Sequence, residues 1–166
     1  MDPLPPPQAA APLMYGAPAP PGELLPWEWA ESRLVAAQHY WIATTRPDGT
    51  PHSRPVWGVW LADGFWFSTG SLAVRNLAAQ PALTVHLEDG RAAVIVEGLA
   101  RPVTDGADLE RMCEVYSAKY SYPVSPCPEG ITDGDGNAGP AYLVRPAKVF
   151  GWDADMHAPT RWTFAS

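Results

Sequence analysis

The sequence predicts a mostly β domain, in which six or seven strands form a small closed or partly closed barrel with three short helices. Three observations lead to this prediction. Aromatic and β-branched residues flank Asp-Gly turns in the middle of the chain, only three short stretches have helical spacing, and 46% of the 166 residues are apolar against 17% charged. Closure would pair the edges that such apolar strands otherwise leave open.

The first segment is rich in proline, with nine of the chain's twenty prolines in residues 1–26. Because proline fixes φ and has no N–H to donate, this segment is predicted to be extended or disordered. We therefore expect a flexible leader over residues 1–23 and one domain over residues 24–166. The leader is either a solvated tail or a strap over a partner subunit.

The domain is predicted to begin with a helix that Pro26 opens and that runs to about His39. Its apolar residues recur three and four positions apart and form one stripe, made of Trp27, Ala30, Leu34 and Ala37. Residues 40–69 then contain three β runs, separated by Pro-Asp-Gly and Ala-Asp-Gly turns. This pattern is typical of an antiparallel meander.

A short helix over residues 72–80 is expected next, followed by two strands that turn at Asp89-Gly90. In the first of these strands apolar residues alternate with polar ones, which places Leu83, Val85 and Leu87 on one face. On the other face His86 is expected to be an ordinary exposed strand residue.

The third helix is predicted over residues 105–120, and its apolar stripe would turn Leu109, Met112, Val115 and Tyr116 inward. A loop rich in Pro and Gly then reaches Pro140. The runs 141–153 and 160–164 are expected to close the sheet.

The eight tryptophans exceed what one small core buries comfortably, so some of them are expected to face a ligand or a second subunit.

Charge and composition exclude several classes of partner. The net charge is −7 and the eleven Lys and Arg residues are scattered, which argues against a nucleic-acid partner. No apolar run is long enough to span a membrane and no signal peptide is recognisable, so we expect a cytoplasmic protein with no membrane partner. Cys113 and Cys127 have no metal-ligand spacing and are expected to stay thiols.

The best candidate site lies where a strand runs into the helix of residues 72–80. Ser68, Thr69, Gly70 and Ser71 place hydroxyl and backbone N–H groups at the helix start, where unpaired N–H groups and the helix dipole favour an anion. Arg75 could add a cation. The alternative is that Ser71 only caps the helix and that Arg75 and Asn76 lie on a solvated face.

A second candidate segment precedes the apolar strand near residue 60. Arg54 lies within reach of the same barrel mouth across one hairpin, and an aromatic ligand could use the backbone of Pro55, Val56 and Gly58 as a flat rim beside Trp57. The alternative is an ordinary surface arginine.

Motifs for other chemistry are missing from the sequence. The four histidines share no short metal spacing, and no pattern typical of acyl transfer, nucleotide hydrolysis or a Rossmann fold occurs. We therefore predict no metal site and no catalytic nucleophile. A redox cofactor held in a groove of the barrel remains open.

Several quoted stretches resemble one family when taken together and in order: "YWIATTRPDGTPHSRPVWGVWLADGFWFSTG", "VRNLAAQPALTVHLEDG", "VIVEG", "AKYSYPV", "AYLVRPAKVFGW" and "TRWTF". They resemble the FMN-binding split-barrel superfamily, and within it the pyridoxamine 5'-phosphate oxidase-like flavin/deazaflavin oxidoreductases. The resemblance covers residues 24–164.

This resemblance implies a six-stranded Greek-key split barrel that forms a homodimer, with FMN or the deazaflavin coenzyme F-420 at the subunit interface. It implies an oxidoreductase in which the cofactor carries hydride to a small conjugated molecule, and no side chain acts as a nucleophile. By position, the cofactor contacts fall on Arg54, Pro55, Val56, Trp57, Gly58, Ser68, Thr69, Gly70, Ser71, Arg75, Asn76 and Trp152. The substrate contacts fall on Lys119, Tyr120, Tyr122 and Trp162.

One departure from the family pattern keeps two alternatives open. Family members usually have a Ser-Arg-Lys run before "RNL", and here the linker is "SLAV", which leaves Arg75 as the local cation. The alternatives are a cofactor-free split barrel that binds a small molecule or catalyses a biosynthetic step, and a haem-binding split barrel. Haem would need His52, His86 or His157 to face the groove.

Overall fold

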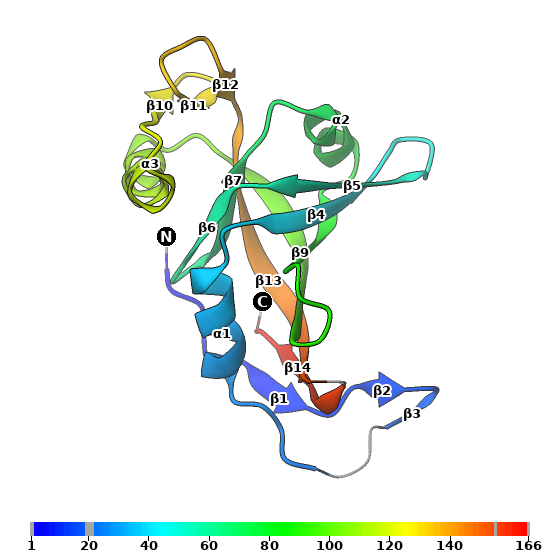
Figure 1. Cartoon of the computed structure of the whole chain (residues 1–166). Coiled ribbons are helices and arrows are strands. Elements are labelled where there is room, and N and C mark those ends of the chain that lie inside the picture. The colour runs from blue at the N-terminus through cyan, green and yellow to red at the C-terminus, as the bar shows by residue number, and fades with distance from the viewer. Residues whose placement is uncertain (1, 19–21, 155, 166) are drawn as a thin grey trace.

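A computed structural model describes residues 2–18, 22–154 and 156–165 of the chain. Its main sheet is antiparallel and contains β1 (Gln8–Ala10), β4 (Tyr40–Thr45), β5 (Pro51–Val56), β6 (Gly58–Leu61), β7 (Gly64–Ser68), β8 (Ala82–His86), β9 (Ala93–Val103), β13 (Ala141–Asp153) and β14 (His157–Thr163). The strand order is β1-β14-β13-β9-β8-β4-β5, and β7 pairs with both β13 and β6 (Figure 1). The predicted mostly β class is confirmed.

Among the described residues, the main sheet has nine strands where at most seven were expected, because the predicted meander breaks once more and the proline-rich segment adds β1. Three β runs were expected between residues 40 and 69, but the second splits at Trp57 into β5 and β6. β5 pairs with β4, whereas β6 pairs with β7. A glycine at position 58 permits this change of partner strand, since a Cβ there would lie 2.4 Å from the Phe65 ring. β5 is therefore an edge strand, and in the described part of the chain no other strand pairs with one side of its backbone.

The first helix, α1 (Trp27–Ala36), ends slightly before the expected boundary and lies along the lower part of the sheet (Figure 1). Ala30 and Leu34 on its predicted stripe are fully buried. Trp27 contacts two core aromatic rings edge-on, those of Trp162 and Phe164. The apolar stripe thus closes the larger of the two core clusters, as the spacing predicted.

The other two helices are α2 (Leu72–Ala79) and α3 (Gly106–Tyr120), both near their predicted bounds. On α3, Leu109, Met112 and Tyr116 are buried as expected. Val115 was predicted to face inward and is 37% exposed, while Cys113 is buried instead. The buried face of α3 therefore contains positions 109, 112, 113 and 116, which follow helical spacing, and Val115 lies at its margin.

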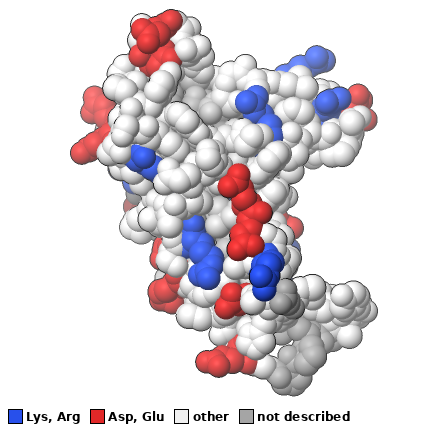
Figure 2. Space-filling view, in the orientation of Figure 1, with Lys and Arg blue, Asp and Glu red and all other residues white. Residues whose placement is uncertain are grey.

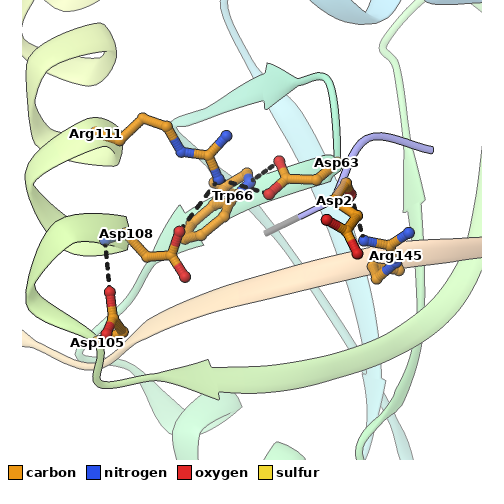
Figure 3. Close-up of polar contacts among 7 residues, drawn as sticks. All are labelled: Asp2, Asp63, Trp66, Asp105, Asp108, Arg111 and Arg145. Carbon is orange, nitrogen blue, oxygen red and sulfur yellow. Dashed lines mark hydrogen bonds and ion pairs between the residues drawn. The ribbon is translucent and has the colours of Figure 1, made fainter.

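A buried carboxylate holds α3 against the β6–β7 hairpin (Figure 3). Asp63 is fully buried in the hairpin turn and accepts a hydrogen bond of 2.8 Å from Trp66 Nε1. Arg111 of α3 forms an ion pair with the same carboxylate and places its guanidinium over the Trp66 ring. This contact fixes the position of α3 relative to the strands that carry the candidate site.

The predicted loop up to Pro140 contains a small sheet of its own. It is built from β10 (Ser125–Cys127), β11 (Gly130–Thr132) and β12 (Ala138–Gly139), which lie beside α3 (Figure 1). The last strand of the main sheet, β14, begins at His157, before the predicted start at residue 160.

The proline-rich segment contacts the domain where the structure describes it; residues 1 and 19–21 lie outside the described part. Residues 8–10 form β1 and pair with residues 161–163 of β14. β2 (Leu13–Met14) and β3 (Ala17–Pro18) form a separate hairpin. Leu4 N donates to Ala62 O at 2.7 Å, and Arg145 donates to Asp2 O at 2.8 Å (Figure 3). Residues 8–10 are thus extended and form an edge strand of the main sheet, whereas the division into a leader and a domain stays a prediction.

Candidate functional site

Two predicted segments meet in one cleft of about 480 Å³, here called the main cleft. It lies between the edge strand β5, the turn after β7 and helix α3. Its lining residues are His39, Arg54, Pro55, Val56, Trp57, Ser68, Thr69, Gly70, Ser71 and Tyr116. The tertiary structure thus brings the strand rim of residues 54–57 to the hydroxyl-rich turn of residues 68–71.

The turn of residues 68–71 is ordered by its own hydroxyl groups. Thr69 Oγ1 and Ser71 Oγ lie 2.8 Å apart, and Ser71 Oγ accepts a 3.2 Å hydrogen bond from Ala73 N at the start of α2. Ser68 Oγ donates to Gly139 O at 3.3 Å. Ser71 therefore caps the helix, as the alternative interpretation held, and the same turn also lines the main cleft.

Arg75 and Asn76 do not line the main cleft. Arg75 is exposed on α2 and lies beside Arg46 and Asp48 at the β4–β5 turn. Asn76 is fully buried, and its Nδ2 donates to Thr44 Oγ1 at 2.9 Å. A helix carries successive side chains around its axis, so neither residue points back to the turn. The cation in the cleft is Arg54.

The two predicted tryptophans also lie elsewhere. Trp162 is 1% exposed and packs inside the core, so it does not line a groove. Trp152 lies near the end of β13 and is paired with Ala93, whereas Ser68 is paired with Ala141 at the start of the same strand. Within one chain Trp152 is thus far from the main cleft.

The end of α3 supports the break between β5 and β6. The Tyr120 ring stacks on the Trp57 ring, with centroids 4.6 Å apart and planes 3° apart. Tyr120 OH accepts a 3.0 Å hydrogen bond from Gly58 N and lies 2.9 Å from Gln38 O. Trp57 is thereby held at the cleft, still 39% exposed.

Lys119 sits behind this stack and is half-buried. Its ammonium donates to Tyr40 OH at 2.9 Å and to Gly58 O at 3.1 Å, and it lies over the Tyr40 ring. Burial lowers the pKa of Lys119 to about 8 and raises that of Tyr40 well above its usual value. Lys119 and Tyr120 therefore touch the backbone of Gly58, and neither lines the main cleft.

A second cleft of about 400 Å³ adjoins the main cleft and is here called the side cleft. The two share Ser68, Thr69, Gly70 and Tyr116. The rest of the side cleft comes from the end of α3 and the small sheet, and consists of Tyr122, Val124, Ile131, Thr132, Asp133, Gly136, Asn137, Ala138 and Gly139. Of the predicted substrate residues, Tyr122 is the one that lines a cleft.

The chain is similar to one known protein family and to several solved structures. The family model described as pyridoxamine 5'-phosphate oxidase matches residues 29–150, which is most of the chain. The chain belongs to the pyridoxamine 5'-phosphate oxidase family. A search of curated proteins found no match.

Solved structures share the fold of this pyridoxamine 5'-phosphate oxidase family member. A protein named F420 reductase is 26% identical, with 72% of this chain and 94% of that one covered and a TM-score of 0.54. A conserved hypothetical protein from Mycobacterium tuberculosis is 21% identical (74% and 81% covered, TM-score 0.61). HutZ, a haem storage protein from Vibrio cholerae, is 15% identical (79% and 95% covered, TM-score 0.59). The split-barrel fold is confirmed.

The histidines named for haem do not line either cleft of this family member. His52 contacts Thr44, His86 stacks on Trp41, and His157 lies on β14. His86 is half-buried by that stacking and not simply exposed. The histidine in the main cleft is His39, which sequence reasoning missed because it follows the apolar stripe of α1 and belongs to no motif.

Two further observations bear on partners. In the part of the chain that the structure describes, no helix is both long and apolar enough to cross a bilayer. On the face drawn in Figure 2, basic and acidic side chains lie in small separate groups.

Proposed function

We propose that this protein is an oxidoreductase that binds F-420 or FMN in the main cleft and transfers hydride to a small conjugated molecule. The observation that carries the proposal is the meeting of residues 54–57 and 68–71 in one cleft, with Arg54 as its cation. The 26% identity to a protein named F420 reductase favours the deazaflavin over FMN.

The main cleft has the chemistry that a phosphorylated ring cofactor needs. Hydroxyls of Ser68 and Thr69, the start of α2 and the Arg54 guanidinium suit a phosphate. The edge of β5 that pairs with no other strand offers backbone N–H and C=O groups to the rim of a ring. Trp57 supplies a flat apolar wall beside it.

The bound cofactor would supply the hydride chemistry itself. The chain's residues then bind, orient and exclude water. Among the described residues that line the main cleft there is no Cys, Lys, Asp or Glu, and the proposal gives its Ser, Thr and Tyr hydroxyls a binding role and not a nucleophilic one. His39 is the titratable group at the cleft besides Tyr116 and Arg54.

The proposal includes a homodimer whose second subunit covers the clefts. Trp57 is 39% exposed and Tyr122 is 38% exposed, both at the junction of the two clefts. Half-exposed aromatic rings of this kind are typical of ligand sites and subunit interfaces. The predicted Trp152 contact with the cofactor would then come from the partner subunit, since within one chain Trp152 is far from the main cleft. We further propose a cytoplasmic protein without nucleic-acid or membrane partners, in keeping with the net charge of −7.

The test is to titrate the purified protein with F-420, FMN and haem and to follow ligand fluorescence and the haem Soret band. Tight binding of F-420 or FMN is expected. Arg54→Gln should weaken it about 10- to 100-fold, as expected for a lost charge-assisted bond of about 1.5–3 kcal/mol, while the exposed Arg75→Gln should leave it unchanged.

Other outcomes of this titration would overturn the proposal. Binding of none of the three ligands would favour the cofactor-free split barrel. A Soret shift without flavin or deazaflavin binding would favour haem, with His39 as the candidate ligand in the cleft. An equal loss in the Arg54 and Arg75 variants would remove the proposed phosphate site.

A further inference from the structure

We propose that the side cleft is the substrate chamber and that it takes an organic cation with a flat conjugated body. This inference rests on the proposed function for its role as a substrate site. The argument uses the shape of the junction between the clefts, the aromatic side chains that line it and the charge of each cleft.

The two clefts adjoin at the turn of residues 68–70. Both are lined by these residues and by Tyr116, so a molecule in the side cleft lies next to a ring held in the main cleft. The side cleft, at about 400 Å³, is within the range that small-molecule sites occupy. Hydride transfer needs such direct contact between the two bound rings.

Aromatic rings form a corner at this junction. The rings of Trp57 and Tyr122 meet at 78° with centroids 5.7 Å apart, and both side chains are more than one third exposed. Tyr120 backs the Trp57 ring from one side, which leaves the corner rigid. Two π faces that meet at such an angle attract an organic cation, and best when it is partly desolvated.

The charges of the two clefts are opposite in sign. Arg54 is in the main cleft, whereas the residues that line the side cleft include Asp133 and no Lys or Arg. Acidic side chains gather at the end of the molecule that β10–β12 form (Figure 2). An anionic substrate would thus meet an acidic wall, and a cationic one would meet a carboxylate and two rings.

The carboxylate of Asp133 is held in place beside the corner. Tyr122 OH donates to Asp133 Oδ2, and Asn137 Nδ2 donates to the same oxygen. The backbone N–H groups of Asp135 and Asn137 donate to Oδ1. The Tyr122 ring and the Asp133 carboxylate are therefore held together by a hydrogen bond, and both lie on the wall of the side cleft.

Three probes of similar shape test the inference: N-methylquinolinium as the cation, quinoline as the neutral molecule and 2-naphthoate as the anion. Each is titrated into the full-length protein, with and without saturating cofactor, and binding is followed by tryptophan fluorescence and NMR. We expect the cation to bind about 5-fold or more tighter than quinoline, and the anion to bind weakest.

Variants separate the ring from the charge. Tyr122→Leu should weaken cation binding about 2- to 5-fold, the range of an exposed cation–π contact, and should weaken quinoline less, because quinoline loses only the apolar contact of the ring. Asp133→Asn should weaken the cation and spare quinoline. Asp135→Asn is the matched control, since it removes the same charge from the same loop at a residue that does not line the cleft.

The outcomes distinguish this inference from the proposed function. If cofactor binds but quinoline or naphthoate binds as well as the cation, the inference is wrong and the proposed function stands. If the cation binds through Tyr122 and Asp133 but no cofactor binds, the cation site stands and its role as a substrate chamber falls. An Asp135→Asn effect equal to that of Asp133→Asn would overturn the placement of the cation.

Discussion

Trp57 and Tyr120 lie face to face, with ring centroids 4.6 Å apart and planes 3° apart. Trp57 stands at the break between β5 and β6, and Tyr120 is the last residue of α3. This stack joins the helix to the strand edge on which the main cleft depends. Residues outside the clefts that fix α3, the break between β5 and β6, or the stack of Trp57 on Tyr120 are therefore expected to affect ligand binding.

The first prediction concerns the break itself. Gly58→Ala is expected to destabilise the protein by about 1–3 kcal/mol, because the new Cβ would lie 2.4 Å from the Phe65 ring and 2.7 Å from Trp66 O. Urea unfolding measures this. Gly106→Ala is the control, since no atom outside its neighbours lies within 4 Å of that Cβ. Equal stability of the two variants would show that the close packing at Gly58 is not as described.

The second prediction concerns the clamp between α3 and the β6–β7 hairpin. Arg111→Met leaves the fully buried Asp63 carboxylate without its cation, which is expected to cost about 3–5 kcal/mol. Asp108→Asn also removes a charge near Arg111, but from a partly exposed pair, and should cost less than about 1 kcal/mol. Thermal and urea unfolding measure both. A smaller loss for Arg111→Met than for Asp108→Asn would contradict the clamp.

The third prediction concerns pH and Lys119. Its pKa in the folded protein is about 8, below the ordinary 10.5, so the unfolded chain binds more protons between these values. The free energy of unfolding of the wild type should therefore rise between about pH 8 and 10.5 relative to Lys119→Met. Urea unfolding at several pH values measures the difference.

A direct titration gives an independent check of this sign. NMR of the Lys119 side chain should show a midpoint near pH 8. A midpoint at the ordinary value, or a wild-type stability that falls over this window relative to Lys119→Met, would show that the hydrogen bonds to Tyr40 and Gly58 outweigh burial.

The fourth prediction concerns the proline-rich segment. Deleting residues 1–12 removes β1 and the hydrogen bond of Leu4 to Ala62, and is expected to cost about 1–2 kcal/mol, or about 3–6 °C in Tm. Cofactor affinity should not change, because β1 lies at the opposite end of the sheet from the turn after β7 (Figure 1). Calorimetry and cofactor titration measure the two effects. If affinity falls while Tm does not, the segment acts on the cleft and not on the sheet edge.

Sequence reasoning named both segments that meet in the main cleft, and the binding of a cofactor there stays a prediction. Residues 54–57 and 68–71 were both predicted, because a strand rim and a hydroxyl-rich helix start are local features. Arg75 was named as the local cation and lies outside the main cleft, since its direction depends on how α2 sits on the barrel. Trp162 was named for the groove and lies in the core, because a tryptophan suits a core as well as a groove.

The amino-acid sequence by itself determined the mostly β class, the three helices and the family, because these depend on local periodicity, turn residues and ordered motifs. Only the tertiary structure decided that Arg54 is the cation of the main cleft, that a side cleft with Asp133 adjoins it, and that the proline-rich segment supplies an edge strand. The physical reason is that these features join residues far apart in the chain, and their meeting is set by packing, about which a local pattern carries no information.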